Sequence, residues 1–191
     1  MAYQNHQNEK LIPPHGGYRN LKSYQTTTLV YDLTAEFCKK FVSSSRMRDQ
    51  MIQAARSGRQ NIAEGCQASG TSKKTELKLV GVARASLEEL LIDYEDFLRQ
   101  KSLRLWNKED PQARVVRELA YRSDKTYETY GSYLENPEPA ANCAVCLIHQ
   151  ANYLLDRQLL SLEQNFLEEG DFTERLYRMR KDSIDKTNRT Y

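Results

Sequence analysis

The side chains best suited to chemistry are Cys143, Cys146 and His149, which follow one another at steps of three. Thiolates and imidazoles bind zinc, and steps of three place such groups on one face of a helix. Structural zinc sites usually draw on two Cys-x-x-Cys or similar elements, and this chain has one. Cysteine also packs as a small apolar residue. The pattern favours buried thiols over a metal site, and we expect no cofactor.

Catalytic groups are scarce elsewhere in the sequence. Two of the three histidines, His6 and His15, lie in a polar segment near residue 1. The chain contains neither the Glu-x-x-His pairs of a di-iron bundle nor the glycine-rich loops that bind phosphates and dinucleotides. Glu88 and Glu89 are adjacent, so they point in different directions on a helix. We therefore expect a protein that is not an enzyme.

Basic residues concentrate between Arg46 and Arg84, where eight arginines and lysines accompany three acids. The chain as a whole has a net charge of only +2, so a preference for anionic partners would rest on this distribution. Six residues are our candidates for nucleic-acid binding through phosphate contacts: Arg48, Arg56, Arg59, Lys73, Lys74 and Lys78. The alternatives are head-to-tail contacts with the acidic stretch 88–96 of another subunit, or ordinary solvated charge.

Arg84 interrupts an apolar line between Val80 and Leu87. A guanidinium at such a position needs a partner, because an unpaired buried charge is costly. Glu64, on the preceding helix, is the predicted partner, and Asn61 is predicted to join the same polar network. We interpret the three residues as fold-specifying; the alternative is that Arg84 contacts a ligand.

Tyrosines crowd the segment 107–139, close to several basic residues. Such rings can stack on nucleobases, but tyrosines also pack at a protein edge with their hydroxyls in water. The second interpretation is favoured. The residues are Tyr121, Tyr127, Tyr130 and Tyr133.

Helical periodicity runs through most of the chain and predicts an all-α protein. The long helices are expected at about 21–42, 46–68, 73–105 and 140–167, with one or two short helices within 111–134. The links between the first three helices are short, so these helices should run antiparallel. The expected fold is an antiparallel up-and-down four-helix bundle, with an inserted helical link between helices three and four.

The helix expected over 46–68 has a buried face of mostly small residues. They recur at steps of three and four: Met51, Ala54, Ala55, Gly58, Ile62 and Gly65. Gly58 and Gly65 each cost about 1 kcal/mol of helix propensity relative to alanine. Close packing against a neighbouring helix is the expected reason for their presence.

The expected organisation has three parts. Residues 1–20 form a mobile tail, residues 21–167 form the bundle with its inserted link at 107–139, and residues 168–191 form a basic suffix that begins as an amphipathic turn and then frays. A capping box is expected at 171–174, with aspartate in the place of serine. Neither a signal peptide nor a membrane-spanning apolar run is evident, so we expect a cytoplasmic protein with reduced thiols and no membrane partner.

Two stretches resemble a known family. Asn61-Ile-Ala-Glu-Gly65 and Ala83-Arg-Ala-Ser-Leu-Glu-Glu89 are similar to the four-helix-bundle family named for 23S rRNA intervening-sequence proteins, which includes accessory proteins of diversity-generating retroelements. The segment 140–175 is similar to a variant with a so-called suffix domain. The resemblance implies a bundle that assembles as a ring, commonly a pentamer, although the short members lack the inserted link. For the retroelement proteins it also implies contacts with nucleic acid and a reverse transcriptase.

Together these features predict a non-catalytic, homo-oligomeric binding or scaffold module. Its basic surface would engage RNA, DNA or a nucleic-acid enzyme such as a reverse transcriptase. The alternative is a purely structural oligomeric assembly module with a protein partner and no nucleic-acid role.

Overall fold

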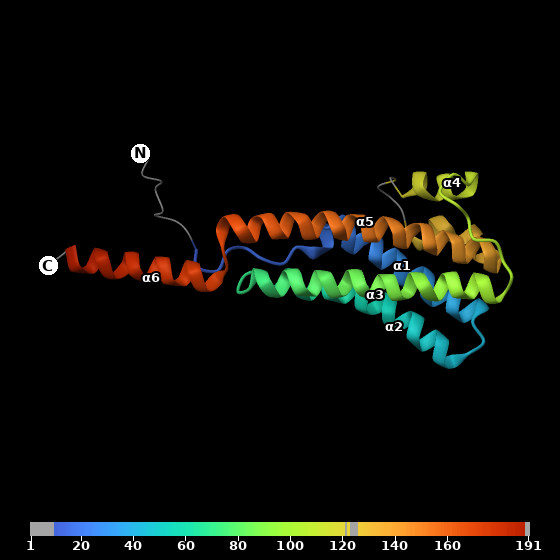
Figure 1. Ribbon diagram of the computed structural model, residues 1–191, viewed down its shortest axis with the longest axis horizontal. Coiled ribbons are helices and arrows are strands. Elements are labelled where there is room, and N and C mark those ends of the chain that lie inside the picture. Colours follow the sequence, from blue (N-terminus) through green and yellow to red (C-terminus); the bar gives the residue numbers. More distant parts are fainter. Residues whose placement is uncertain (1–9, 121, 123–125, 190–191) are drawn as a thin grey trace.

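The computed structural model describes residues 10–120, 122 and 126–189 (Figure 1). These residues form helices and no strands, which confirms the predicted all-α class. In chain order the elements are η1 (Tyr18–Asn20), α1 (Lys22–Phe41), α2 (Ser45–Ala68), α3 (Lys73–Gln100), α4 (Pro111–Leu119), η2 (Tyr127–Glu135), α5 (Pro137–Glu169) and α6 (Phe172–Arg189).

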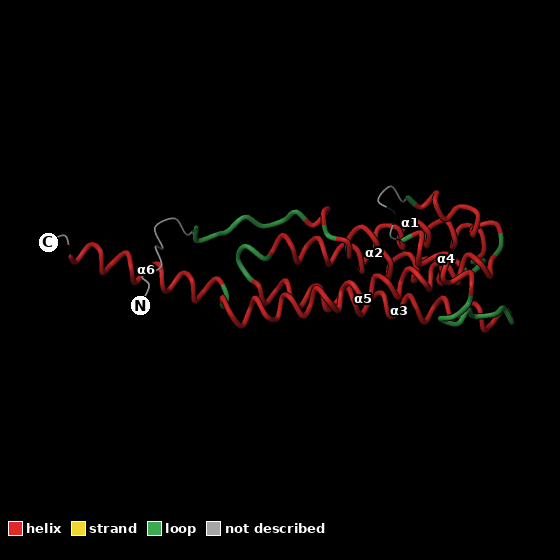
Figure 2. The backbone as a smooth tube through the Cα atoms, turned by 90° about the horizontal axis from the view of Figure 1, so that it is seen from above, coloured by secondary structure: helices red, strands yellow, loops and turns green. Residues whose placement is uncertain are grey.

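The long helices α1, α2, α3 and α5 lie side by side and form the body of the molecule (Figures 1 and 2). α2 contacts α1 and α3, and α5 contacts α3 and α1, so the contacts close around a shared core. Each helix supplies large side chains that are at most 1% exposed, such as Phe37, Met51, Leu87 and Leu147. This arrangement is consistent with the predicted bundle. None of the described helices combines the length and the apolar composition that a membrane crossing requires.

The predicted small-residue face of α2 is buried, as expected from its spacing, and its two glycines face α3. A Cβ atom placed on Gly58 would lie 2.7 Å from Leu87 Cδ2, closer than side chains can approach. A Cβ atom on Gly65 would lie 3.3 Å from the backbone oxygen of Glu76. The two glycines therefore allow α2 and α3 to pack in close contact.

Helix α3 ends at Gln100, five residues before the predicted end at Leu105. Ser102 adopts a left-handed backbone conformation with φ of 54°, and the amide of Leu103 donates to the carbonyl of Leu98 at 2.9 Å. Beyond this turn, Asn142 of α5 accepts from the amide of Trp106 at 2.7 Å and donates to the carbonyl of Arg104 at 2.8 Å. These hydrogen bonds to Asn142 hold residues 104–106 in a non-helical conformation against α5.

The inserted link folds into α4 and η2, which both contact α5. Pro111 occupies the first turn of α4, and Asp110 Oδ1 accepts from the amide of Gln112 at 2.9 Å. Asp110 is 6% exposed and pairs with Arg104, with 2.9 Å between Oδ2 and NH2. The short helices predicted within 111–134 are thus present and held against the bundle.

The start of the described chain packs against the turn between α2 and α3. The amide of Gly16 donates to the carbonyl of Cys66 at 3.1 Å, and the Cys66 thiol donates to the carbonyl of Gly16 at 3.0 Å. Residues 1–9 of the predicted mobile tail lie outside the described residues.

The prediction that the suffix frays is wrong, because α6 is helical from Phe172 to Arg189. This segment contains no proline or glycine, and Glu174 Oε2 accepts from the amide of Asp171 at 2.9 Å at its start. In Figure 1, α6 projects beyond the end of the bundle where α2 turns into α3.

Candidate functional site

Arg84 does not pair with Glu64, so the predicted partner is wrong. Arg84 binds Glu88 on its own helix, with 2.6 Å between NH1 and Oε2, and Asp156 on α5, with 3.1 Å between Nε and Oδ1. On α3 the residues that face α2 are those opposite Gly58 and Gly65. Arg84 lies one position beyond this row, so its half-buried side chain faces α5 while Glu64 stays exposed on α2.

Asn61 belongs to a different polar contact. Its Nδ2 donates to the carbonyl of Ser57 at 2.9 Å and to Ser57 Oγ at 3.1 Å. Ser57 Oγ lies 2.9 Å from Ser86 Oγ of α3. The α2–α3 interface therefore has a neutral hydrogen-bonded cluster where the sequence suggested an ion pair.

Three of the six candidate nucleic-acid contacts make interactions within the chain. Arg48 NH1 donates to the carbonyl of Val42 at 3.0 Å, at the end of α1. The guanidinium of Arg59 lies 4.3 Å from the ring centroid of Tyr31, a cation–π contact. Lys73 pairs with Glu169 of α5. These side chains help to hold helices together.

The other three candidates, Arg56, Lys74 and Lys78, are exposed and form no ion pair with any described residue. The six candidates do not form one patch. Arg48 lies near the first turn of α2, whereas Lys74 follows its last turn, and a helix of 24 residues is about 36 Å long. The structure thus separates Lys73, Lys74 and Lys78, at the start of α3, from Arg48.

Helix α6, which begins at the end of the bundle that carries Lys74 and Lys78 and projects beyond it, carries further basic residues. Asp171 Oδ1 accepts from the amide of Lys73 at 2.9 Å and from the amide of Phe172 at 2.8 Å, so one carboxylate caps both α3 and α6. Arg180 and Lys181 of α6 are exposed. We call Lys74, Lys78, Arg180 and Lys181 the basic end of the molecule.

The surroundings of Asp171, between α5 and α6, stabilise the negative charge of its carboxylate. Burial raises the pKa of Asp171, but the backbone amides of Phe172, Lys73 and Lys74 and the Ser72 hydroxyl together hold it below its ordinary value. The expected capping box is half formed: Glu174 caps the amide of Asp171, while the Asp171 carboxylate also turns to α3. A hydrogen bond from Lys73 likewise lowers the pKa of Glu169.

The cysteines adjoin no set of metal ligands. Among the described residues, no three or more histidine, cysteine or acidic side chains are placed to hold a metal ion. Cys143 is 1% exposed, and burial raises the pKa of its thiol. Burial also raises the pKa of Cys146 to about 11, although Arg117 acts in the opposite direction.

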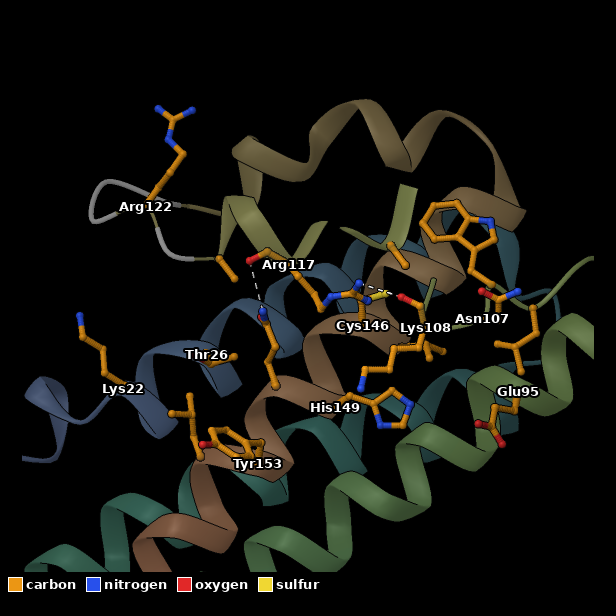
Figure 3. A pocket seen from close by; sticks show the side chains of 17 residues that line it. Lys22, Thr26, Glu95, Asn107, Lys108, Arg117, Arg122, Cys146, His149 and Tyr153 are labelled. Atoms are coloured by element: carbon orange, nitrogen blue, oxygen red, sulfur yellow. Dashed lines mark hydrogen bonds between the residues drawn. The ribbon is translucent and has the colours of Figure 1, made fainter. Parts of the chain in front are cut away.

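A pocket that the sequence did not reveal lies between α4, α5, the start of α1 and the segment 105–108 (Figure 3). Its volume is about 890 Å³. Leu105, Trp106 and Val145 are among its apolar lining residues, and Lys22 and Arg117 are among its basic ones. These residues come from four separate segments, so no local pattern in the sequence marks them.

The tyrosines of the inserted link mostly pack against the bundle. Tyr130 is fully buried, and Tyr133 makes an edge contact with Trp106, with 6.3 Å between ring centroids. Tyr127 is 40% exposed, and Tyr121 lies outside the described residues. Tyr130 and Tyr133 thus have packing roles, but the Tyr130 hydroxyl is buried without a hydrogen-bond partner among the described residues, whereas the favoured interpretation placed such hydroxyls in water.

Residues 20–110 match the family described as 23S rRNA-intervening sequence protein. This range contains α1, α2 and α3 and both sequence stretches that suggested the resemblance. No curated protein and no solved structure matches the chain. The resemblance of segment 140–175 to a suffix domain stays a prediction. Over residues 20–110, the chain is therefore similar to the 23S rRNA-intervening sequence protein family, as the two stretches suggested.

Proposed function

We propose that the protein is a non-catalytic nucleic-acid-binding module that contacts the phosphate backbone through its basic end. The observation that carries this proposal is the position of Lys74 and Lys78, which are exposed at the start of α3 where α6 leaves the bundle. Lysines in this setting act as point charges for phosphates and need no particular base sequence. The family description refers to 23S rRNA and names no reaction, which agrees with this proposal.

The proposal assigns phosphate binding to fewer of the six candidate residues than the sequence suggested. Arg48, Arg59 and Lys73 already contact other groups of the chain, so binding phosphate would disturb the bundle. Lys74, Lys78, Arg180 and Lys181 form no ion pair within the described part of the chain and need no rearrangement. Arg56, exposed along α2, stays a candidate for a further contact.

Fluorescence anisotropy with labelled single-stranded RNA and duplex DNA, at low and physiological salt, tests the proposal. Binding should weaken steeply with salt, by a logarithmic slope of about −0.7 to −0.9 for each phosphate contact. A variant carrying Lys74→Glu, Lys78→Glu and Arg180→Glu should lose most of the affinity.

The matched control carries Lys39→Glu, Arg46→Glu and Lys101→Glu. These exposed residues lie toward the opposite end of the bundle, and the total charge changes by the same amount. An equal loss of nucleic-acid affinity in both variants would show that only the net charge matters. That result would contradict the proposal that the basic end is the binding surface. If the intact protein bound no nucleic acid at low salt, the nucleic-acid proposal would be wrong and the structural assembly module would be the remaining interpretation. Analytical ultracentrifugation would then measure the number of subunits.

A further inference from the structure

We propose that the pocket between α4 and α5 binds a small molecule in which an anionic group is attached to an apolar body. This inference does not depend on nucleic-acid binding, because none of the lining residues belongs to the basic end, and α4, which helps to line the pocket, lies toward the opposite end of the bundle (Figure 1).

The size and lining of the pocket suit an organic ligand. Its volume of about 890 Å³ falls in the range of small-molecule sites, roughly 300–1,000 Å³. Apolar side chains from the loop, α4 and α5 form its walls, among them Leu105, Trp106, Ala113 and Val145. Leu105 is 46% exposed, so apolar surface at the pocket is left in contact with water. Burial of that surface by a ligand would be favourable.

Basic side chains give the pocket its preference for an anion. Lys22, Lys108 and Arg117 line it and form no ion pair with a carboxylate of the described residues, whereas Glu95 is the one acidic side chain in the described lining. In Figure 3, Arg117 and Lys108 lie together in the middle of the pocket, and Glu95 lies at one side. An anion placed beside Arg117 and Lys108 would therefore meet positive charge within the lining, while the carboxylate of Glu109, outside the lining, also interacts with both cations.

Arg117 is held in position for such a contact. Its NH2 donates to the carbonyl of Lys108 at 2.7 Å, and its own carbonyl accepts from Gln150 Nε2 at 3.4 Å. The guanidinium has further N–H groups for a carboxylate or phosphate. Trp106 Nε1 and Gln150 Oε1, both in lining residues, are buried without a hydrogen-bond partner among the described residues. A polar group of a ligand that formed a hydrogen bond with either atom would stabilise the complex.

The probe for this site is 1-anilinonaphthalene-8-sulfonate, which joins a sulfonate to two aromatic groups. Its neutral counterpart, N-phenyl-1-naphthylamine, lacks the sulfonate and serves as the control ligand. Titration of the full chain, followed by fluorescence, should show saturable binding of the anionic probe and weaker binding of the neutral one. Equal affinity for the two probes would contradict the proposed role of the cations.

Two pairs of variants locate the binding. The double variant Lys22→Gln with Lys108→Gln should lower the affinity for the anionic probe about tenfold and change the affinity for the neutral probe little. The control variant, Lys39→Gln with Lys101→Gln, should change neither affinity. Leu105→Glu puts a carboxylate at the pocket and should abolish binding of the anionic probe. Leu160→Glu is its control, because Leu160 is 57% exposed on α5 outside the pocket. Circular dichroism checks that each variant folds.

Competition then distinguishes the anionic group. Displacement of the bound probe by decanoate would identify a carboxylate ligand, and displacement by adenosine monophosphate would identify a phosphate ligand. Either result supports the proposal. Displacement by neither, or unchanged probe binding in Leu105→Glu, would overturn it.

Discussion

At Cys146, burial and charge act on the thiol in opposite directions. Burial raises its pKa, nearby Arg117 lowers it, and the result is about 11. The pKa of Cys38 is raised to about 12, again mainly by burial. Because the thiolate is the form that attacks electrophiles and binds metals, these cysteines are inert at neutral pH.

We predict that the folded protein reacts slowly with iodoacetamide at pH 7. The thiolate fraction of Cys146 should rise about tenfold for each pH unit up to pH 11, so its alkylation should be about a hundredfold faster at pH 9. Mass spectrometry of timed samples measures this rate. In guanidinium chloride all four cysteines should react as unperturbed thiols. Rapid modification of Cys146 in the folded protein at pH 7 would contradict the prediction.

At the scale of elements, the packing of α2 on α3 depends on glycine. Gly58 has Leu87 directly above it, whereas Gly81 of α3 has no neighbouring atom within 4 Å of an added Cβ. Alanine improves helix propensity by about 1 kcal/mol at either position, and only at Gly58 does its methyl group meet an occupied site.

We predict opposite effects of the same substitution. Gly81→Ala should raise the free energy of unfolding by about 0.5–1 kcal/mol, because it gains helix propensity without a clash. Gly58→Ala should lower it by about 1–2 kcal/mol, because displacement of Leu87 costs more than the propensity gained. Urea unfolding followed by circular dichroism measures both values. If Gly58→Ala were as stable as Gly81→Ala, the α2–α3 contact would be looser than described.

The periodicity of the sequence was sufficient to predict the long helices and the buried face of α2, because these depend on local spacing. It could not predict which neighbour Arg84 faces, since one position along α3 decides between α2 and α5. The end of α3 depends on Asn142, more than 30 residues later. The pocket is lined by at least five separate segments, α1, α3, residues 105–108, α4 and α5, and only their packing brings the lining residues together.

On the scale of the whole molecule, Asp171 connects the C-terminal helix to the bundle. Its carboxylate caps α3 and α6 together, and the ion pair between Lys73 and Glu169 lies beside it. Gly170, with φ of 70°, provides the sharp change of direction between α5 and α6. The orientation of α6 therefore depends on contacts with the start of α3.

We predict that Asp171→Ala lowers stability by about 1 kcal/mol at pH 7, a typical value for loss of a helix cap. The pKa of Asp171 is lowered in the folded protein, so its stabilising charge is fully present above the unfolded value of about 4. The contribution is lost as pH falls from there through the folded pKa. The difference in melting temperature between wild type and variant should thus shrink below pH 4. Glu163→Ala, exposed on α5, is the control; a constant difference from pH 7 to pH 3 would contradict the prediction.

The shared cap at Asp171 also restricts where the chain can be shortened. The projecting α6 is an obvious segment to remove by limited proteolysis or by a stop codon. A truncation after residue 169 would take away the carboxylate that accepts from Lys73 and leave the first turn of α3 partly uncapped. A truncation after Arg175 would keep Asp171 and the glutamate that caps it. The natural boundary of the bundle therefore lies inside the first turn of the next helix.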